Sequence, residues 1–146
     1  MSAIERMTVA AALERDAFGS SSADEATAVR VWLNTLFPRY DYVAFNVRLG
    51  DGRASAPSTE WAIERMWRSL TQRRADVIGW YGRDMDVVEV KHHARMQAVT
   101  QVRLYALLAK DAFPDVDRVR PVIVCRSCSS GVETAMRNVG GHVEIV

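Results

Sequence analysis

The sequence has few cysteines and prolines and almost no net charge. Its 146 residues include two Cys and four Pro, and 19 basic side chains nearly balance 18 acidic ones. Two cysteines cannot build a disulfide framework, and they are too few for a structural zinc site or an iron–sulfur cluster without other ligands. Because 49% of the residues are hydrophobic, we expect one globular domain spanning residues 1–146.

Long apolar runs are also missing. The first residues alternate between apolar and charged side chains (Ile4, Glu5, Arg6, Met7), and no apolar stretch has the length of a signal peptide or a membrane span. We therefore expect a cytoplasmic protein with no membrane partner.

Two amphipathic helices are predicted over residues 1–38. The first covers residues 2–17, and the second runs from Ser22 to Phe37. Ser22 and Glu25 have the spacing of a capping box, in which each side chain accepts a hydrogen bond from the other residue's main chain. Pro38 ends the second helix.

The remaining residues, 40–146, alternate between strand and helix patterns. The expected elements are a strand at 40–49 with Val43, Phe45, Val47 and Leu49 on one side, a helix at 58–73, strands at 75–80 and 85–91, a helix at 94–111, a strand at 119–125, a helix at 130–138 and a strand at 142–146. This order predicts an α/β fold with a central mixed sheet flanked by helices.

A charged face is predicted on the two central strands. The two-residue period of a strand puts Glu89 and Lys91 on one face, while valines 88 and 90 lie on the other. If a tight turn at Tyr81–Asp84 joins the strands, Asp76 lies opposite Glu89 on the same face. Facing carboxylates have Cβ atoms roughly 5 Å apart and repel each other unless something bridges them.

A divalent cation is the natural bridge between these carboxylates. Mg²⁺ or Mn²⁺ takes oxygen ligands, which Asp76, Glu89 and the Val90 carbonyl would supply. Lys91 would orient a metal-bound water or stabilise a scissile phosphate. The competing interpretation is an amphipathic surface hairpin whose Glu and Lys are merely solvated.

A second polar pair follows on the next helix, where Gln101 and Tyr105 are four residues apart and share a face. Asp76, twelve intervening residues, Glu89-Val90-Lys91 and then Gln101-Val-Arg-Leu-Tyr105 resemble the PD-(D/E)XK nuclease core and the Gln-x-x-x-Tyr motif of its RecB-like branch. The resemblance covers residues 58–125. It implies a restriction-endonuclease-like fold and metal-dependent hydrolysis of DNA.

By the same resemblance, Asp76 and Glu89 are metal ligands, Lys91 is the catalytic lysine, and Gln101 and Tyr105 contact DNA or support the site. The preceding helix often adds an acidic residue in this family, for which Glu64 or Glu60 is available. Glu64 could equally form an ordinary helix pair with Arg68.

Basic residues are concentrated around this motif. Residues 65–103 contain eight Lys and Arg against four acidic residues. These side chains could contact DNA phosphates or form a solvated basic face. The arginines concerned are Arg65, Arg68, Arg73, Arg74, Arg83, Arg95 and Arg103. His92 and His93 follow the lysine and are either near the site or surface residues at a strand end.

Cys125 and Cys128 offer a competing chemistry. A helix beginning after them could lower the pKa of a thiol and suit it to redox catalysis. The pair follows a late strand of the predicted core, whereas thioredoxin-like motifs stand at the start of a βαβ unit. We therefore expect two free thiols in a reducing cytosol.

Two functions remain open at this point. The first is a Mg²⁺-dependent deoxyribonuclease, with a phage or mobile-element origin suggested by the habits of the family. The second is a nuclease-fold structural or interaction component of a larger assembly, such as a phage head–neck connector. The N-terminal helical pair would suit homo-oligomerisation or docking into such an assembly.

Overall fold

The computed structural model describes residues 4–18, 22–36, 39–49 and 74–146. One predicted element, the helix at 58–73, lies outside the described residues. Among the described residues, no helix has the length and apolar character needed to cross a membrane.

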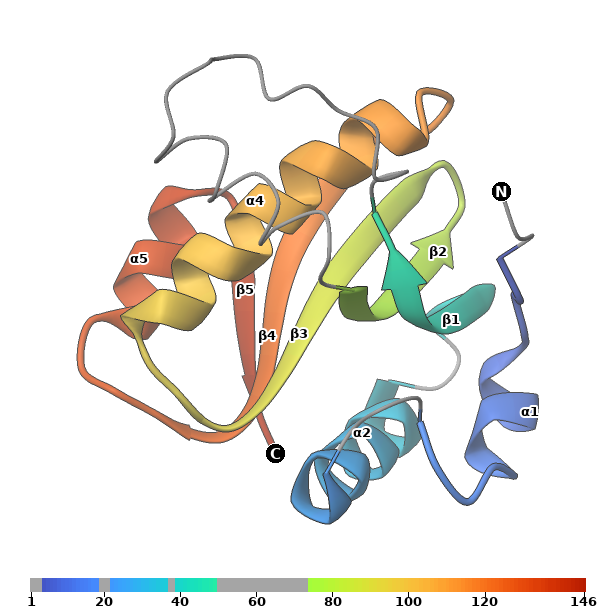
Figure 1. Cartoon of the computed structure of the whole chain (residues 1–146), viewed down its shortest axis with the longest axis horizontal. Helices are drawn as coiled ribbons and strands as arrows, with labels where there is room; N and C mark the ends of the chain where they lie inside the picture. The colour runs from blue at the N-terminus through green and yellow to red at the C-terminus, as the bar shows by residue number, and fades with distance from the viewer. Residues whose placement is uncertain (1–3, 19–21, 37–38, 50–73) are drawn as a thin grey trace.

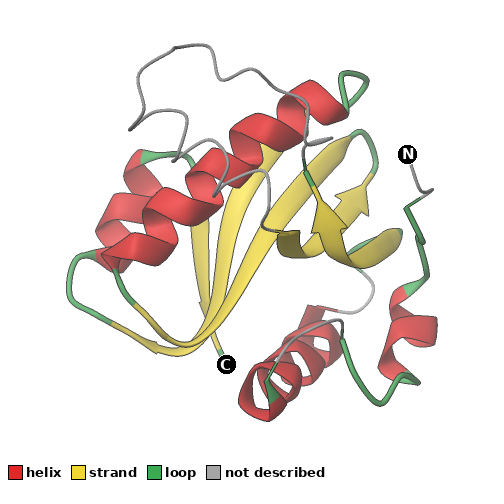
Figure 2. Cartoon of the chain, viewed as in Figure 1, coloured by secondary structure: helices red, strands yellow, loops and turns green. Residues whose placement is uncertain are grey.

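Five strands form one mixed sheet in the order β1-β2-β3-β4-β5, as Figures 1 and 2 show. The first three strands form an antiparallel meander, and β3, β4 and β5 run parallel to one another. Their bounds are β1 (Tyr42–Arg48), β2 (Arg74–Tyr81), β3 (Asp84–Ala94), β4 (Arg118–Cys128) and β5 (His142–Ile145). The predicted fold class, a mixed sheet flanked by helices, is confirmed.

Helices cover both faces of this sheet. On one face α4 (Met96–Ala112) packs over β3 and β4, and α5 (Val132–Asn138) lies beside it (Figure 1). On the other face α2 (Ala23–Leu36) packs against valines of β3 and β4, next to the short α1 (Val9–Leu13). The strands β3 and β4 are therefore covered on both sides, which explains the continuous apolar run Pro121–Cys125 in the middle of β4.

The capping box predicted at the start of α2 is confirmed. The Glu25 main-chain N–H donates to Ser22 Oγ (3.2 Å), and the Ser22 N–H donates to Glu25 Oε2 (3.3 Å). These bonds satisfy two main-chain donors that the first turn of a helix leaves unpaired.

The N-terminal helix predicted at 2–17 is wrong in its extent. The helix α1 begins after Thr8, whose side-chain oxygen accepts from the Ala11 N–H (3.2 Å). Before it, Met7 exchanges two main-chain hydrogen bonds with Val43 of β1 (2.9 and 2.8 Å). The edge of β1 offers this segment a main-chain partner, and that pairing replaces the helix that amphipathicity alone favours.

The prediction that β1 has a single apolar side is also wrong. Val43 and Phe45 pack with the core under α2, but Val47 and Leu49 pack with the core under α4. Asn46 lies between them with a positive φ of 54°. One residue in the left-handed region breaks the two-residue alternation of a strand.

The β2–β3 hairpin has the predicted register. Tyr81 pairs with Asp84 across a turn made by Gly82 and Arg83, and Val77 pairs with Val88 further along. Gly82 has φ +57°, which a glycine adopts without the steric cost that a Cβ would bring.

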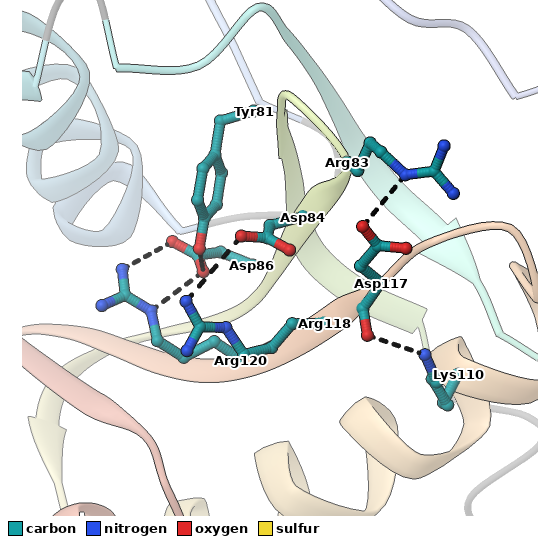
Figure 3. A network of polar contacts seen from close by, with 8 residues as sticks. All are labelled: Tyr81, Arg83, Asp84, Asp86, Lys110, Asp117, Arg118 and Arg120. Carbon is teal, nitrogen blue, oxygen red and sulfur yellow. Dashed lines mark hydrogen bonds and ion pairs between the residues drawn. The ribbon is translucent and has the colours of Figure 1, made fainter.

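A buried polar network joins this hairpin to β4 and to Tyr40, which lies just before β1. The Asp86 side chain is fully buried and accepts hydrogen bonds from Tyr40 (2.6 Å), Tyr81 (3.0 Å) and the Arg120 guanidinium (3.0 and 2.9 Å). Figure 3 shows Asp86 between Tyr81 and Arg120. Because each carboxylate oxygen has partners, the burial of this charge is compensated.

Replacing Asp86 with Ala should lower the free energy of unfolding by roughly 3 kcal/mol, because Tyr40 and Arg120 lose their buried acceptor. Asp84→Ala is the matched control on the same strand, since its partner Arg118 is 3.8 Å away and 76% exposed. That exposed pair should contribute at most about 1 kcal/mol. Urea denaturation of both variants tests this, and equal losses would contradict it.

Candidate active site

Asp76 and Glu89 lie toward the end of the hairpin that is remote from its turn. They lie one residue beyond Val77 and Val88, the last pair of the β2–β3 ladder, and the charge of Asp76 acts on Glu89. Their direct pairing across the two strands stays a prediction. The Val90 N–H donates a 2.8 Å hydrogen bond to Asp76 Oδ2. The Asp76 side chain therefore bridges β2 to the main chain of β3 just beyond Glu89.

Glu89 is a buried carboxylate with incomplete compensation. The residue is 4% exposed, and its Oε1 lies 3.3 Å from Lys91 Nζ. Its Oε2 is buried and has no hydrogen-bond partner among the described residues. A buried charged oxygen without a partner is costly, so the position suits an additional cation.

The pKa values of both carboxyl groups are raised. Burial, opposed by the Val90 hydrogen bond, raises the pKa of Asp76 to about 6. Burial and the charge of Asp76 together raise the pKa of Glu89 to about 8, although Lys91 opposes the shift. A bound divalent cation would remove the repulsion between the buried Glu89 carboxylate and the half-buried Asp76 carboxylate.

Glu25 is a residue of this site that sequence reasoning missed. Its charge raises the pKa of both Asp76 and Glu89, so the first turn of α2 lies near the pair. The acidic residue expected from the helix before the motif, Glu64 or Glu60, lies outside the described residues. The capping box marked Glu25 in the sequence, but its place beside the site depends on how α2 packs on the sheet.

The described residues suit a divalent cation held by few protein ligands. No group of three or more His, Cys, Asp or Glu side chains is gathered tightly enough to hold a metal within the ranges that the structure describes. Two carboxylates with water and substrate phosphate completing the shell are what Mg²⁺ commonly uses. The unpartnered oxygen of Glu89 fits that requirement.

Gln101 and Tyr105 share a face of α4, as predicted. Gln101 Nε2 donates to the Tyr105 hydroxyl (3.2 Å). Tyr105 is fully buried in the core formed with β2 and β3, and it packs with Val87, two residues before Glu89. Tyr105 therefore supports the strand that carries Glu89 by packing beneath it.

The predicted DNA-contacting arginines that the structure describes are exposed, and Arg83 lies at the remote hairpin turn, where it pairs with Asp117. Arg74 at the start of β2 and Arg95 before α4 are exposed, as is Arg103 on α4. Arg73 lies outside the described residues. His93 is engaged away from the carboxylates, because its two ring nitrogens contact the hydroxyls of Ser127 (2.8 Å) and Ser129 (3.0 Å).

The cysteine pair does not have the properties of a catalytic thiol. Cys125 and Cys128 are free, and Cys125 is fully buried within β4. Burial, with smaller contributions from Cys128 and Glu133, raises the pKa of the Cys125 thiol to about 11. Cys125 is therefore not a low-pKa nucleophile. It acts as a small core side chain and pairs with Lys91 in the β3–β4 register.

No family model and no curated protein matches this chain. Its fold is similar to parts of three solved structures. An EndoMS structure in apo form is 25% identical, with a TM-score of 0.43 over 48% of this chain and 33% of that one. A repair endonuclease from Pyrococcus abyssi is 24% identical, with a TM-score of 0.45 over 51% of this chain and 33% of that one. An EndoMS–dsDNA complex is 14% identical, with a TM-score of 0.48 over 90% of this chain and 48% of that one. The chain spans from one third to about half of the length of these proteins.

Proposed function

We propose that this chain is a metal-dependent deoxyribonuclease that hydrolyses phosphodiester bonds with Mg²⁺ or Mn²⁺. The observation that carries the proposal is the Glu89 carboxylate, buried beside Asp76 and Lys91 with one oxygen lacking a partner among the described residues. Strongly perturbed carboxyl groups next to a lysine are typical of functional sites.

Asp76 and Glu89 would hold the cation, together with the Val90 carbonyl. The Val90 N–H points toward Asp76, and in a strand the N–H and C=O of one residue point the same way. The Val90 carbonyl is therefore directed toward the same side as the Asp76 carboxylate. This arrangement would provide two charged ligands and one neutral ligand, leaving positions for water and phosphate.

Lys91 would act on the reacting atoms. The bound cation supplies a water of lowered pKa and offsets charge on the phosphoryl oxygens. The Lys91 side chain is 36% exposed, so its ammonium reaches solvent while its partner Glu89 does not. With the cation sharing the negative charge of Glu89, the Lys91 ammonium would be free to orient the attacking water or to bind a non-bridging phosphate oxygen.

DNA is the proposed polyanionic partner. Arg74 and Arg95 are exposed at the start of β2 and immediately after β3, the two strands that carry the site. Guanidinium groups bind phosphate in two-point contacts and so hold a duplex in register without reading its sequence. Residues of the basic segment would thus position the backbone over Lys91.

Wild-type protein should cleave plasmid or linear DNA with Mg²⁺ or Mn²⁺. Glu89→Ala and Lys91→Ala should each reduce the rate by about 100-fold or more, because the first removes a ligand of the cation and the second removes the ammonium that acts on the reacting phosphate. Asp84→Asn is the matched control, since Asp84 lies at the turn end of the same strand. Gel assays with EDTA as a blank measure the rates.

Cleavage that survives both substitutions would reject this site. If the wild type cleaves no DNA but assembles into a defined ring or particle, the structural role of a nuclease-fold component replaces the enzymatic one. Size-exclusion chromatography with light scattering on the same preparation detects that outcome.

Cation binding should strengthen as the pH rises, because the ligands must lose protons. With pKa values of about 6 for Asp76 and about 8 for Glu89, the pair retains protons near neutral pH. Mn²⁺ affinity should increase by up to about tenfold per pH unit for each proton released. Titration calorimetry in buffers of different ionisation enthalpy measures both the affinity and the protons released.

The cation-free protein should show the opposite trend in stability. The folded-state pKa of Glu89 lies above its ordinary value of 4.5, so the ionised form opposes folding. The free energy of unfolding should decrease as the pH rises from about 4.5 to about 8. Glu89→Gln should be less sensitive to pH over this window in urea denaturation, and an unchanged pH dependence would contradict the buried-charge account.

A further inference from the structure

Asn46 is a backbone outlier within a β-strand. Its φ is 54°, and among the described residues it is the one non-glycine position with a positive φ. Asn tolerates this region better than most residues, but a strand does not normally require it. Outliers of this kind persist where the surrounding structure holds them, and they cluster at functional sites.

Asn46 lies across the strand pair from Asp76. The β1–β2 register pairs Phe45 with Val77 and Val47 with Ala75, but the pair between them, Asn46 and Asp76, is absent from the ladder. The interruption of the sheet therefore falls on the residue that carries one of the two site carboxylates.

Both strands change faces at this interruption. On β1, Phe45 packs with the core under α2 and Val47 with the core under α4. On β2, Val77 and Ala75 divide between the same two cores in the same way. Residues two apart in a regular strand share a face, so β1 and β2 rotate together where Asn46 and Asp76 meet.

This rotation has a consequence for β3. The β2–β3 ladder ends at Val77 and Val88, although a regular ladder would go on to place Ala75 opposite Val90. The Val90 N–H instead donates to the Asp76 carboxylate. The side chain of Asp76 thus takes the place that a main-chain acceptor of β2 would hold in an uninterrupted sheet.

We infer that Asn46 is a positioning residue for the active site: its left-handed backbone conformation turns β2 away from β3 and brings the Asp76 carboxylate onto the Val90 N–H. The inference rests on the proposed function for its catalytic meaning. The proposed role of Asn46 is a backbone role, because the geometry depends on its φ angle and the Asn46 amide group makes no hydrogen bond within the described residues.

A backbone role predicts an unusual order among substitutions. Asn46→Gly keeps the left-handed conformation accessible, whereas Asn46→Ala disfavours it. In protein without metal, Asn46→Gly should keep the hydrogen-exchange protection of the Val90 amide, and Asn46→Ala should lower it by about tenfold. Two-dimensional NMR of the full chain measures this, with circular dichroism to establish that each variant is folded.

The matched control uses Tyr42, an exposed residue of the same strand without a positive φ. At this position Tyr42→Gly should preserve the hydrogen-exchange protection of Val90 no better than Tyr42→Ala, because glycine weakens an ordinary strand position. Mn²⁺ titration calorimetry provides the second readout. Asn46→Gly should bind within about threefold of wild type, and Asn46→Ala about tenfold more weakly.

Loss of Val90 protection in a folded Asn46→Gly protein would overturn the backbone role. Wild-type protection and affinity in Asn46→Ala would overturn the inference as a whole. If Asn46→Ala does not fold, the Asn46→Gly result alone decides. Absence of Mn²⁺ binding in the wild type would reject the proposed function, whereas the Val90 measurement, made without metal, would still test the role of Asn46.

Discussion

The exclusion of the Glu89 carboxylate from water is the constraint on which the proposed chemistry depends. The sheet buries this group between strands, and Lys91 neutralises one of its oxygens while the other has no partner among the described residues. Burial raises the pKa values of Glu89 and Asp76, and the charge of Glu25 adds to both shifts. The fold therefore brings the carboxyl groups of Asp76 and Glu89 together where water solvates their charge poorly. A divalent cation would relieve the repulsion between their ionised forms.

The strand β3 carries a second buried carboxylate, Asp86, whose role is structural. Asp86 is fully buried, yet four hydrogen bonds from Tyr40, Tyr81 and Arg120 satisfy its oxygens. Glu89, three residues on, lacks such a network. Charges without compensation are expensive to keep in a core. The difference between these two carboxylates of one strand thus distinguishes the architectural role of Asp86 from the chemical role proposed for Glu89, a distinction that burial alone would not make.

The irregular point in the sheet links the architecture to this site. A regular three-stranded meander would pair the main chains of β1, β2 and β3 throughout. The outlier at Asn46 and the missing pair with Asp76 interrupt that ladder, and the carboxylate of Asp76 binds the Val90 N–H instead. Phe45 and Val77 pack in one core, and Val47 and Ala75 pack in the other. This packing on either side of the break holds the interruption in place.

Local patterns in the sequence determined the hairpin and its register from Tyr81–Asp84 to Val77–Val88, because a tight turn and a two-residue period act between near neighbours. The same holds for the Ser22–Glu25 capping box and for the Gln101–Tyr105 pair on one turn of helix. Only the tertiary structure decided that Met7 pairs with Val43 of β1, that Cys125 is an inert core thiol, and that Glu25 acts on the carboxylates. It also decided that β1 divides its apolar side chains between two cores at Asn46. These features depend on contacts between segments far apart in the chain, and their energies exceed the local propensities that a sequence pattern records.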